Sequence, residues 1–322
     1  KLTISAVEEA ESSKEDADLI AKVVAVASDE LVNKVVDEVS KNSTDENQTL
    51  SAQVLKAIVD SDSGKIDIIN DDVKDTMIKQ TIESAQNQQE GTGIQQDQDM
   101  TSIVSDIIVN TDTETGSKMI EELNNTESEN DLSLQVISAI SEKDTTKLNT
   151  LSENNKEQIE KLTETAIKNA DASEESAQLI AKVVVNASDE LANKVVQEVT
   201  KNSTEENQAL SAKVMKSIVE TNPEKIENLS DENKGNIISQ TIEAAKNQAE
   251  GNASDSLDLS NTIAEIVIKS NDETATKVLE TLSEATNDSE SKLALNVVSN
   301  LTKQENFEEK LDVISISSSA VD

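Results

Sequence analysis

The side chains in this sequence that could do chemistry are almost all carboxylates. The 322 residues include 65 Asp and Glu against 28 Lys, and they contain no His, Cys, Trp, Tyr or Arg. Without His or Cys the chain lacks an imidazole base, a thiolate nucleophile and the usual zinc ligands. Phosphate loops and dinucleotide fingerprints are also missing. We therefore expect a protein that is not an enzyme.

Neighbouring carboxylates could in principle act as an acid and base pair or hold a cation. Such pairs stand at Glu8-Glu9, Asp71-Asp72 and Glu121-Glu122. Catalytic acids need a perturbed and positioned environment, whereas acids this abundant at helix surfaces are usually solvated. We interpret these pairs as exposed helix faces and predict no catalytic residue.

A calcium loop is the one metal motif worth testing. Asp60, Asp62 and Gly64 have the alternate spacing of an oxygen-rich cation loop, but the glycine comes one place early for an EF-hand. The copy at 220–224 lacks the glycine and contains Pro223. We interpret both as turns and helix caps. We predict no metal site and no cofactor, and weak binding of divalent cations by the acidic surface stays open.

The formal net charge of -37 restricts the partners that the chain can have. Nucleic acid and anionic membrane surfaces would repel it, so we expect neither as a partner. Basic proteins, cations and copies of the same chain remain. No stretch has the length of apolar sequence that a membrane span needs. The sparing use of aromatic and sulfur residues favours an extracellular or cell-surface protein, with the cytoplasm as the alternative.

Tandem duplication is the strongest signal in the sequence. Residues 19–50 and 179–210 are identical at 25 of 32 positions, with an offset of 160. Residues 103–123 match the stretch that starts at Leu19 with an offset of 84. This periodicity predicts four units of about 80 residues. The predicted divisions are 1–18 as the end of a preceding unit, 19–102, 103–178, 179–261 and an incomplete 262–322.

Apolar residues recur at helical spacing within each unit. After Ser28, which we predict to be an N-cap, come Leu31, Val35, Val36 and Val39. The same cap recurs in the second copy. The spacing predicts a first helix at 17–27 and then a hairpin partner. Each unit is thus expected to contain two helical hairpins and one additional closing helix.

Three further elements complete this unit. The spacing predicts helices at 48–59 and 71–88, followed by a polar loop around the glycines of 91–93. In the second copy Asn222 is expected to cap a helix that has Pro223 at its first position. Valine pairs favour strands by propensity, but spacings of three and four without hairpin turns favour helices.

The expected fold is all-α, a right-handed solenoid-like array of short antiparallel helices. Two-helix units in tandem resemble the α-solenoids of the HEAT, armadillo and tetratricopeptide kind. This resemblance covers nearly the whole chain at the level of architecture. The Trp, Gly and Tyr signature of tetratricopeptides and the Pro and Arg pattern of many HEAT units are missing, so no family function is implied for any residue.

The two ends of the sequence fall within the repeat. Lys1 falls where Lys161 falls, and residues 310–314 resemble 65–69. Placing one copy after another nearly restores the register, which predicts a head-to-tail homopolymer or adjacent repeats of a longer chain. Frayed ends, or a C-terminal strand, are the alternatives. The predicted assembly ends are Lys1, Leu2, Ile4, Phe307, Leu311, Val313, Ile314 and Ile316.

Two functions follow from this organisation. The first is a non-catalytic structural role, as an acidic helical-repeat subunit of an extracellular or surface filament or scaffold. The alternative is a helical-repeat adaptor that binds a basic protein or peptide partner. Binding faces are usually rich in aromatic and Arg anchors. Because these are nearly absent here, the first function is the expectation from sequence.

Overall fold

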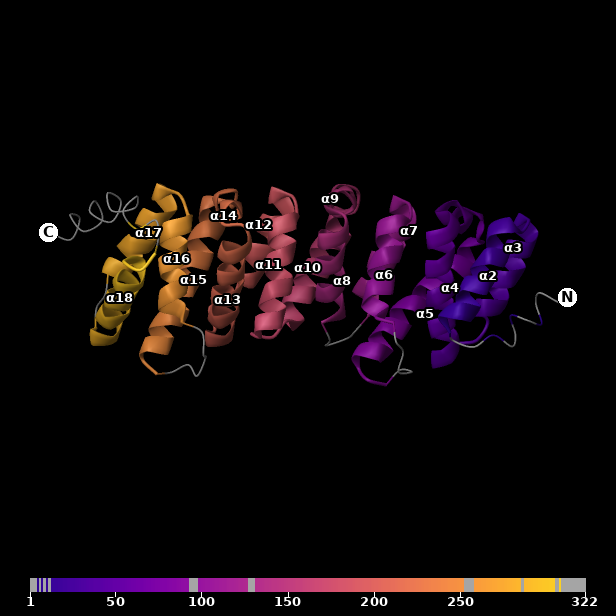
Figure 1. Cartoon of the computed structure of the whole chain (residues 1–322), viewed down its shortest axis with the longest axis horizontal. Helices are drawn as coiled ribbons and strands as arrows, with labels where there is room; N and C mark the ends of the chain where they lie inside the picture. Colours follow the sequence, from indigo (N-terminus) through magenta and orange to yellow (C-terminus); the bar gives the residue numbers. More distant parts are fainter. Residues whose placement is uncertain are drawn as a thin grey trace. The chain divides into compact units, whose positions relative to one another are not determined.

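Helices account for all the regular structure that can be described. The computed structural model of the chain describes residues 13–92, 98–126, 131–251, 258–284 and 287–304, together with Ser5, Val7, Ala10 and Phe307. These residues contain no strand (Figure 1). They form two compact units, Lys1–Asn169 (unit 1) and Ala170–Asp322 (unit 2). The predicted all-α, solenoid-like repeat architecture is confirmed.

Unit 1 is a two-row stack of helices. Its described elements are α2 (Lys14–Val26), α3 (Asp29–Ser40), α4 (Asp45–Asp62), the 3-10 helix η1 (Ser63–Ile68), α5 (Asp71–Gln89), α6 (Met100–Asn110), α7 (Thr113–Asn125), α8 (Leu132–Lys143), α9 (Thr145–Asn154) and α10 (Lys156–Asn169). Helices α2, α4, α6 and α8 pack in succession along one row, and α3, α5, α7 and α10 pack along the other.

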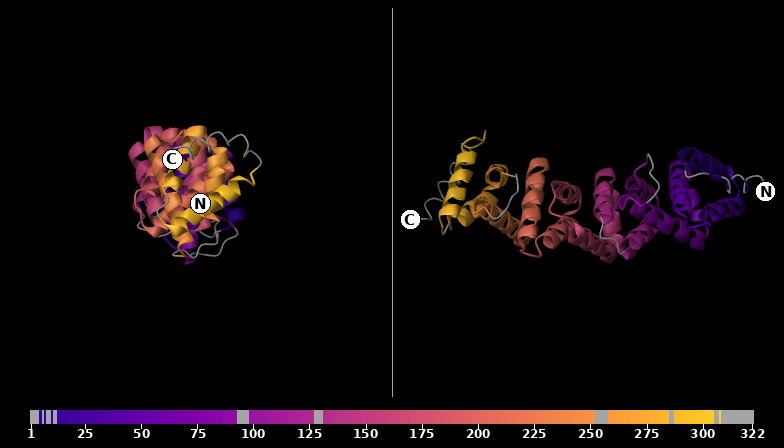
Figure 2. Two further views of the ribbon diagram at one scale, coloured as in Figure 1. Left: turned by 90° about the vertical axis from the view of Figure 1, so that its left-hand side faces the viewer. Right: turned by 90° about the horizontal axis from the view of Figure 1, so that it is seen from below.

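Unit 2 repeats this plan. Its described elements are α11 (Glu174–Asn186), α12 (Asp189–Val199), α13 (Glu205–Thr221), α14 (Glu224–Glu227), α15 (Asp231–Ala249), α16 (Leu259–Lys269), α17 (Asp272–Ser283) and α18 (Asp288–Leu301). Helices α11, α13, α16 and α18 form one row, with α12, α15 and α17 in the other. The right-hand view in Figure 2 shows the two rows within each unit.

Local sequence explains where the helices begin. Short polar side chains accept hydrogen bonds from the first free backbone N–H groups, as Ser13 does from Asp16 (3.1 Å) and Thr204 does from Asn207 (3.3 Å). Acidic residues occupy most first turns, where the positive end of the helix dipole stabilises them. The acidic composition therefore also serves helix formation.

The core consists of thin aliphatic layers between the rows. Leu55, Ile58, Met77 and Ile82 are among the largest side chains that are fully buried in unit 1. Each repeat buries only a narrow apolar stripe, so it depends on its neighbours for cover. The chain can therefore fold with one Phe and without Trp or Tyr.

The expected inward faces were slightly misplaced. Leu31 is only half-buried because the stripe of α3 is shifted by one residue, and Val32 is fully buried instead. Val73 is half-buried as well, on the outer edge of α5. Ser28 stands at the predicted N-cap but its side chain accepts no capping bond, whereas Ser188 accepts one from Leu191 (3.4 Å).

The prediction for Asn222 and Pro223 was wrong. Asn222 ends α13, where its N–H donates to the Ile218 carbonyl (2.8 Å), and Pro223 stands at the N-cap position of α14. Pro223 precedes the single turn of α14 without a capping side chain. The physical reason is that α14 is a single turn whose N-cap position is occupied by Pro223, and proline has no side-chain acceptor.

The loop predicted around the first glycines begins with a left-handed residue. Gly91 has a φ of 66°, and it follows the end of α5. The N–H of Gly91 donates to the Gln88 carbonyl (3.2 Å) and that of Thr92 donates to Asn87 (3.0 Å). This is the Schellman pattern, which glycine accommodates without strain. Gly93 lies outside the described residues.

Helices α2 and α4 begin before residues 17 and 48, and α4 and α5 end after residues 59 and 88, because capping adds residues that carry no apolar signal, whereas α2 ends one residue before the predicted 27. The handedness of the array and the four-unit divisions stay predictions. No helix among the described residues is long and apolar enough to cross a membrane.

Candidate functional site

Several polar residues that recur in the repeats close helix ends. A lysine side chain donates to a backbone carbonyl at the end of a repeat's first helix, where four carbonyls lack helical partners. The bonds run from Lys65 to Ala27 (3.4 Å), from Lys147 to Thr111 (2.5 Å) and from Lys225 to Ala187 (2.7 Å). Burial lowers the pKa of Lys147, and this effect outweighs the opposing influence of the nearby charges of Asp112 and Asp144. These lysines have a structural role.

A buried glutamine braces each of the two long duplicated segments. The Gln80 side-chain amide donates to the carbonyls of Ser40 (3.0 Å) and Asn42 (2.8 Å), and it accepts from Ser51 (2.5 Å). In unit 2 the equivalent partners of Gln240 are Thr200, Asn202 and Ser211. Residues that the duplication repeats are thus used to join helices, so a functional site is better sought among those that differ.

A groove between α2, α4 and α6 of unit 1 meets this condition. Its volume is about 260 Å³. The floor is apolar and the walls are charged, with four carboxylates against two lysines. The lining residues are Lys14, Ala17, Asp18, Gln53, Lys56, Ala57, Asp60, Gln98, Asp99, Ser102, Ile103 and Asp106.

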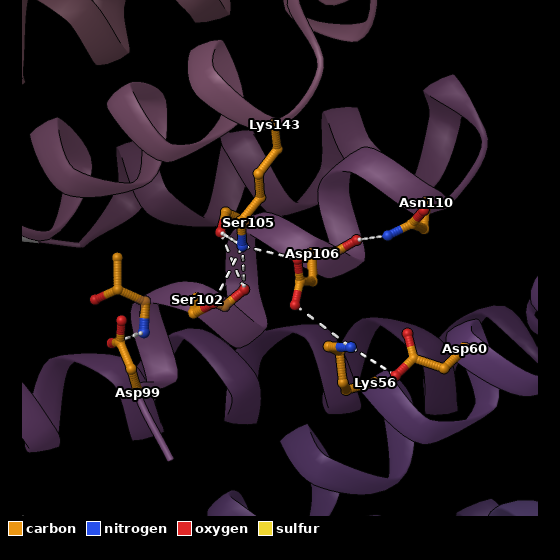
Figure 3. Close-up of polar contacts among 9 residues, drawn as sticks. Lys56, Asp60, Asp99, Ser102, Ser105, Asp106, Asn110 and Lys143 are labelled. Carbon is orange, nitrogen blue, oxygen red and sulfur yellow. Dashed lines mark hydrogen bonds and ion pairs between the residues drawn. The ribbon is translucent and has the colours of Figure 1, made fainter. Parts of the chain in front are cut away.

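Lys56 bridges two of the helices that form the groove. Its Nζ lies 2.6 Å from Asp60 Oδ2 on the same helix and 3.4 Å from Asp106 Oδ2 on α6 (Figure 3). Burial opposes the positive charge, but the hydrogen bond to Asp60 and the charge of Asp106 outweigh it. The pKa of Lys56 is therefore raised. Lys56 is held as a cation and neutralises this side of the groove.

Lys143 of α8 holds Asp106 from the other direction. Its Nζ lies 2.7 Å from Asp106 Oδ1 and donates to the hydroxyls of Ser102 (3.1 Å) and Ser105 (3.0 Å) (Figure 3). Asp106 therefore contacts two ammonium groups. These ion pairs connect α6 to α4 through Lys56 and to α8 through Lys143.

Among the described residues, Asp18 and Asp99 are the two carboxylates of the groove that form no ion pair with a lysine. Asp99 Oδ1 accepts the Thr101 N–H (3.0 Å) as the N-cap of α6. Asp18 is half-buried on α2, and neither carboxylate forms an ion pair within the described part of the chain. Ala17, Ala57 and Ile103 also line the groove and are buried, so these small or aliphatic side chains form its floor. The groove thus offers anionic oxygens above an apolar floor.

Several of the corresponding residues of unit 2 are different. Lys213 stands in place of Gln53, and its Nζ donates to the Ala172 carbonyl (2.6 Å). Glu174 stands in place of Lys14 and lies 3.0 Å from Lys216. Gln178 replaces Asp18. Two lysines therefore occupy this face of α13, while Glu220, Asp258 and Glu265 stand in place of Asp60, Asp99 and Asp106, so the two units differ in where the charges lie.

The residues predicted as assembly ends are mostly outside the described part of the chain. Phe307 is described: it is helical and half-buried, and its N–H donates to the Gln304 carbonyl (3.2 Å). No assembly contact is present to test its predicted role. The residues of this set outside the description are Lys1, Leu2, Ile4, Leu311, Val313, Ile314 and Ile316.

The calcium-like stretch is divided between two elements. Asp62 ends α4, the 3-10 helix follows directly, and Asp60 pairs with Lys56. Over the ranges given above, no group of three or more acidic side chains could hold a metal ion. Of the neighbouring carboxylate pairs noted in the sequence, Asp71 lies 3.5 Å from Lys74 Nζ and forms an ion pair with it. The weak cation binding suggested by composition stays a prediction.

Sequence reasoning did not identify the groove. Its acids come from residues 18–106 and only the packing of three helices brings them together. A comparison of the two copies could have pointed to it. The glutamines that join helices are the same in both copies, whereas groove residues such as Asp18 and Gln53 are replaced.

Comparisons with known proteins yield structural likenesses at low identity. No family model and no curated protein sequence matches the chain. The Puf4 RNA-binding domain bound to an RNA is 10% identical, with a TM-score of 0.47 over 96% of this chain and 91% of that one. Kap121p bound to Ste12p is 14% identical, with a TM-score of 0.45 over 90% of this chain and 31% of that one. An engineered protein is 14% identical, with a TM-score of 0.37 over 98% of this chain and 81% of that one.

Proposed function

We propose that the chain is a non-catalytic helical-repeat adaptor that captures a basic segment of a partner protein or peptide. The observation that carries this proposal is the groove of unit 1, in which four carboxylates face two lysines above an apolar floor. A Lys or Arg side chain of the partner would lay its aliphatic stem on the floor and present its charge to the carboxylates.

The free carboxylates define where that charge binds. Asp60 and Asp106 are already held by Lys56, so Asp18 and Asp99 are the acceptors for an incoming cation. A partly exposed ion pair contributes about 0.2–1 kcal/mol. Two such pairs give modest affinity, which the net charge of -37 supplements by steering basic partners to the surface.

Titration of an Arg-rich peptide into the full chain tests this function. Asp18→Asn together with Asp99→Asn should weaken binding roughly tenfold, since about 1–2 kcal/mol of ion pairing is lost. Asparagine keeps the cap of α6. The matched control is Asp37→Asn with Asp72→Asn, which removes the same charge from exposed positions of α3 and α5.

The control variant should change the dissociation constant less than about twofold, because exposed charges at a distance are screened. An equal loss in both variants would mean that bulk charge alone attracts the peptide. An extracellular location and the lack of a nucleic-acid partner stay predictions from composition.

A further inference from the structure

The groove of unit 1 already contains a cation that belongs to the chain itself. The Nζ of Lys56 lies 2.6 Å from Asp60 Oδ2 and 3.4 Å from Asp106 Oδ2 (Figure 3). Lys56 lines the groove and its side chain is only 23% exposed, so most of its length is removed from solvent. A basic side chain of a partner would bind a pair of carboxylates in the same way, with its stem covered and its charge on the oxygens.

The four carboxylates of the groove form two pairs. Asp18 and Asp99, which form no ion pair in the described part of the chain, make up the open subsite. Asp60 and Asp106, which hold Lys56, make up the filled subsite. Asp106 follows Asp99 by seven residues on α6, so the two subsites are separated by about 10 Å along that helix.

The filled subsite has no room for a second cation. Asp106 uses both of its oxygens, because Lys143 lies 2.7 Å from Oδ1 while Lys56 contacts Oδ2. A Lys or Arg side chain that approached Asp60 would meet the ammonium group of Lys56 at close range. Like charges repel at such distances, and the partial burial of Lys56 limits screening by solvent.

The second copy of this lysine has a different partner. Lys216 stands in place of Lys56, and its Nζ lies 3.0 Å from Glu174 on α11 and 3.8 Å from Glu220 on its own helix. Glu174 stands in place of Lys14, which offers no carboxylate on α2. The lysine of unit 1 reaches α6 instead. The residue on the neighbouring helix thus determines where the lysine places its charge.

We propose that Lys56 determines the specificity of the groove by occupying the filled subsite, so that the groove accepts one basic side chain of a partner and excludes a second. This inference rests on the proposed function and defines the partner more closely, as a segment with a single Lys or Arg flanked by uncharged residues. Removing the charge of Lys56 should open the filled subsite to a second basic residue about 10 Å from the first. In an extended peptide, at about 3.3 Å per residue, that spacing is Arg-x-x-Arg.

Titration calorimetry of the full chain with two peptides of equal length and charge tests this role. One peptide contains Arg-x-x-Arg, and the other has its two Arg residues about 30 Å apart when extended, too far to reach both subsites. The wild type should bind the two with dissociation constants within about twofold of each other, because only one Arg of either peptide is bound. Lys56→Met keeps an unbranched stem and should bind Arg-x-x-Arg about tenfold more tightly than the other peptide.

Two further variants serve as controls. Lys56→Arg keeps the charge and should retain the wild-type ratio of the two dissociation constants. Lys34→Met removes the same charge from an exposed ion pair with Glu30 (2.5 Å) on α3, and it should also leave the ratio unchanged. If Lys56 served only to tie α4 to α6, Lys56→Met would alter stability and leave the ratio at the wild-type value.

The outcomes separate this inference from the proposed function. A wild type that already prefers Arg-x-x-Arg about tenfold, or a Lys56→Met variant without that preference, would overturn the inference. The proposed function fails on a different result, if Asp18→Asn with Asp99→Asn leaves peptide binding unchanged. If the wild type binds neither peptide, binding of Arg-x-x-Arg by Lys56→Met would still support the role of Lys56, and no binding by that variant would contradict it.

Discussion

The junction between η1 and α7 in unit 1 and the junction between α14 and α17 in unit 2 use corresponding residues with different chemistry. In unit 1, Asp67 faces Asp112, the N-cap of α7. In unit 2, Glu227 faces Asn271, the N-cap of α17. One junction joins two carboxylates, and the other joins a carboxylate to an amide.

The amide junction surrounds the Glu227 carboxylate with hydrogen-bond donors. The Asn271 N–H donates to Glu227 Oε1 (3.0 Å), and its side-chain amide donates to Oε2. Thr274 (3.3 Å) and Lys234 (3.3 Å) also donate to this carboxylate. All its contacts are with donors, which is the arrangement that stabilises an anion.

The acid junction is satisfied only when the pair holds a proton. The hydrogen bond with Asp112, together with burial, raises the pKa of Asp67. Burial opposes the charge of Asp112, but the Thr115 N–H and the bond from Asp67 outweigh it and lower the pKa of that carboxyl. When both carboxyls are ionised, they repel each other. Duplicated sequence can thus keep a fold while changing how a junction responds to its surroundings.

The largest expected effect concerns what the two units share. Gln80→Ala and Gln240→Ala should each cost about 2–3 kcal/mol of local stability, because each leaves a buried hydroxyl and two carbonyls without their partner. Hydrogen exchange, followed amide by amide, should show the loss in the unit that carries the change. A cost below about 0.5 kcal/mol, or equal loosening of both units, would contradict a bracing role.

The second effect converts the amide junction into an acid one. Asn271→Asp should destabilise the start of α17 by about 1–2 kcal/mol, because it places a carboxylate against Glu227 and removes an amide donor. Faster exchange at the Thr274 amide measures this. Aspartate caps as well as asparagine. Unchanged exchange would therefore mean that Glu227 contributes little to the junction.

The smallest effect is the reverse change, with its pH dependence. Asp112→Asn should slow exchange at the start of α7 at neutral pH by removing the repulsion, which is worth about 0.2–0.5 kcal/mol. In the wild type, the raised pKa of Asp67 makes its contribution fully present below the unfolded pKa, about 3.9. That contribution is lost as the pH rises through the folded pKa.

The lowered pKa of Asp112 acts in the opposite direction below that range, since its contribution is lost as the pH falls through its own folded pKa. The acid junction should therefore be most protected between the two folded pKa values. Asp112→Asn should remove the loss above this window. An identical pH profile in wild type and variant would show that the two carboxyls do not interact.

Much of the fold was predictable from local sequence. The spacing of Val35, Val36 and Val39 fixes α3, and an offset of 160 carries that prediction to unit 2. Errors such as Leu31 are shifts of one residue around a helix, where neighbouring stripes differ by little in apolar content. Helix ends were less predictable, since a cap depends on backbone geometry that residue type alone does not determine.

The site could not be predicted in the same way. Asp18, Lys56 and Asp106 lie far apart in a chain where acids are the commonest surface residues, and nothing local distinguishes them. Only the packing of α2, α4 and α6 gives them a shared environment. Exposure is equally hard to predict, because residues 293–301 of α18 match 132–140 of α8, and yet Leu295 is 70% exposed where Leu134 is 2% exposed.

Paramagnetic NMR with a spin-labelled Arg-rich peptide tests the central claim most directly. At low peptide concentration the amides of Ala17, Ala57 and Ile103 should broaden first. Their counterparts in unit 2, Ala177, Ser217 and Thr262, should broaden only at higher concentration. Equal broadening of both sets, or stronger broadening in unit 2, would contradict the assignment of the binding site to the groove of unit 1.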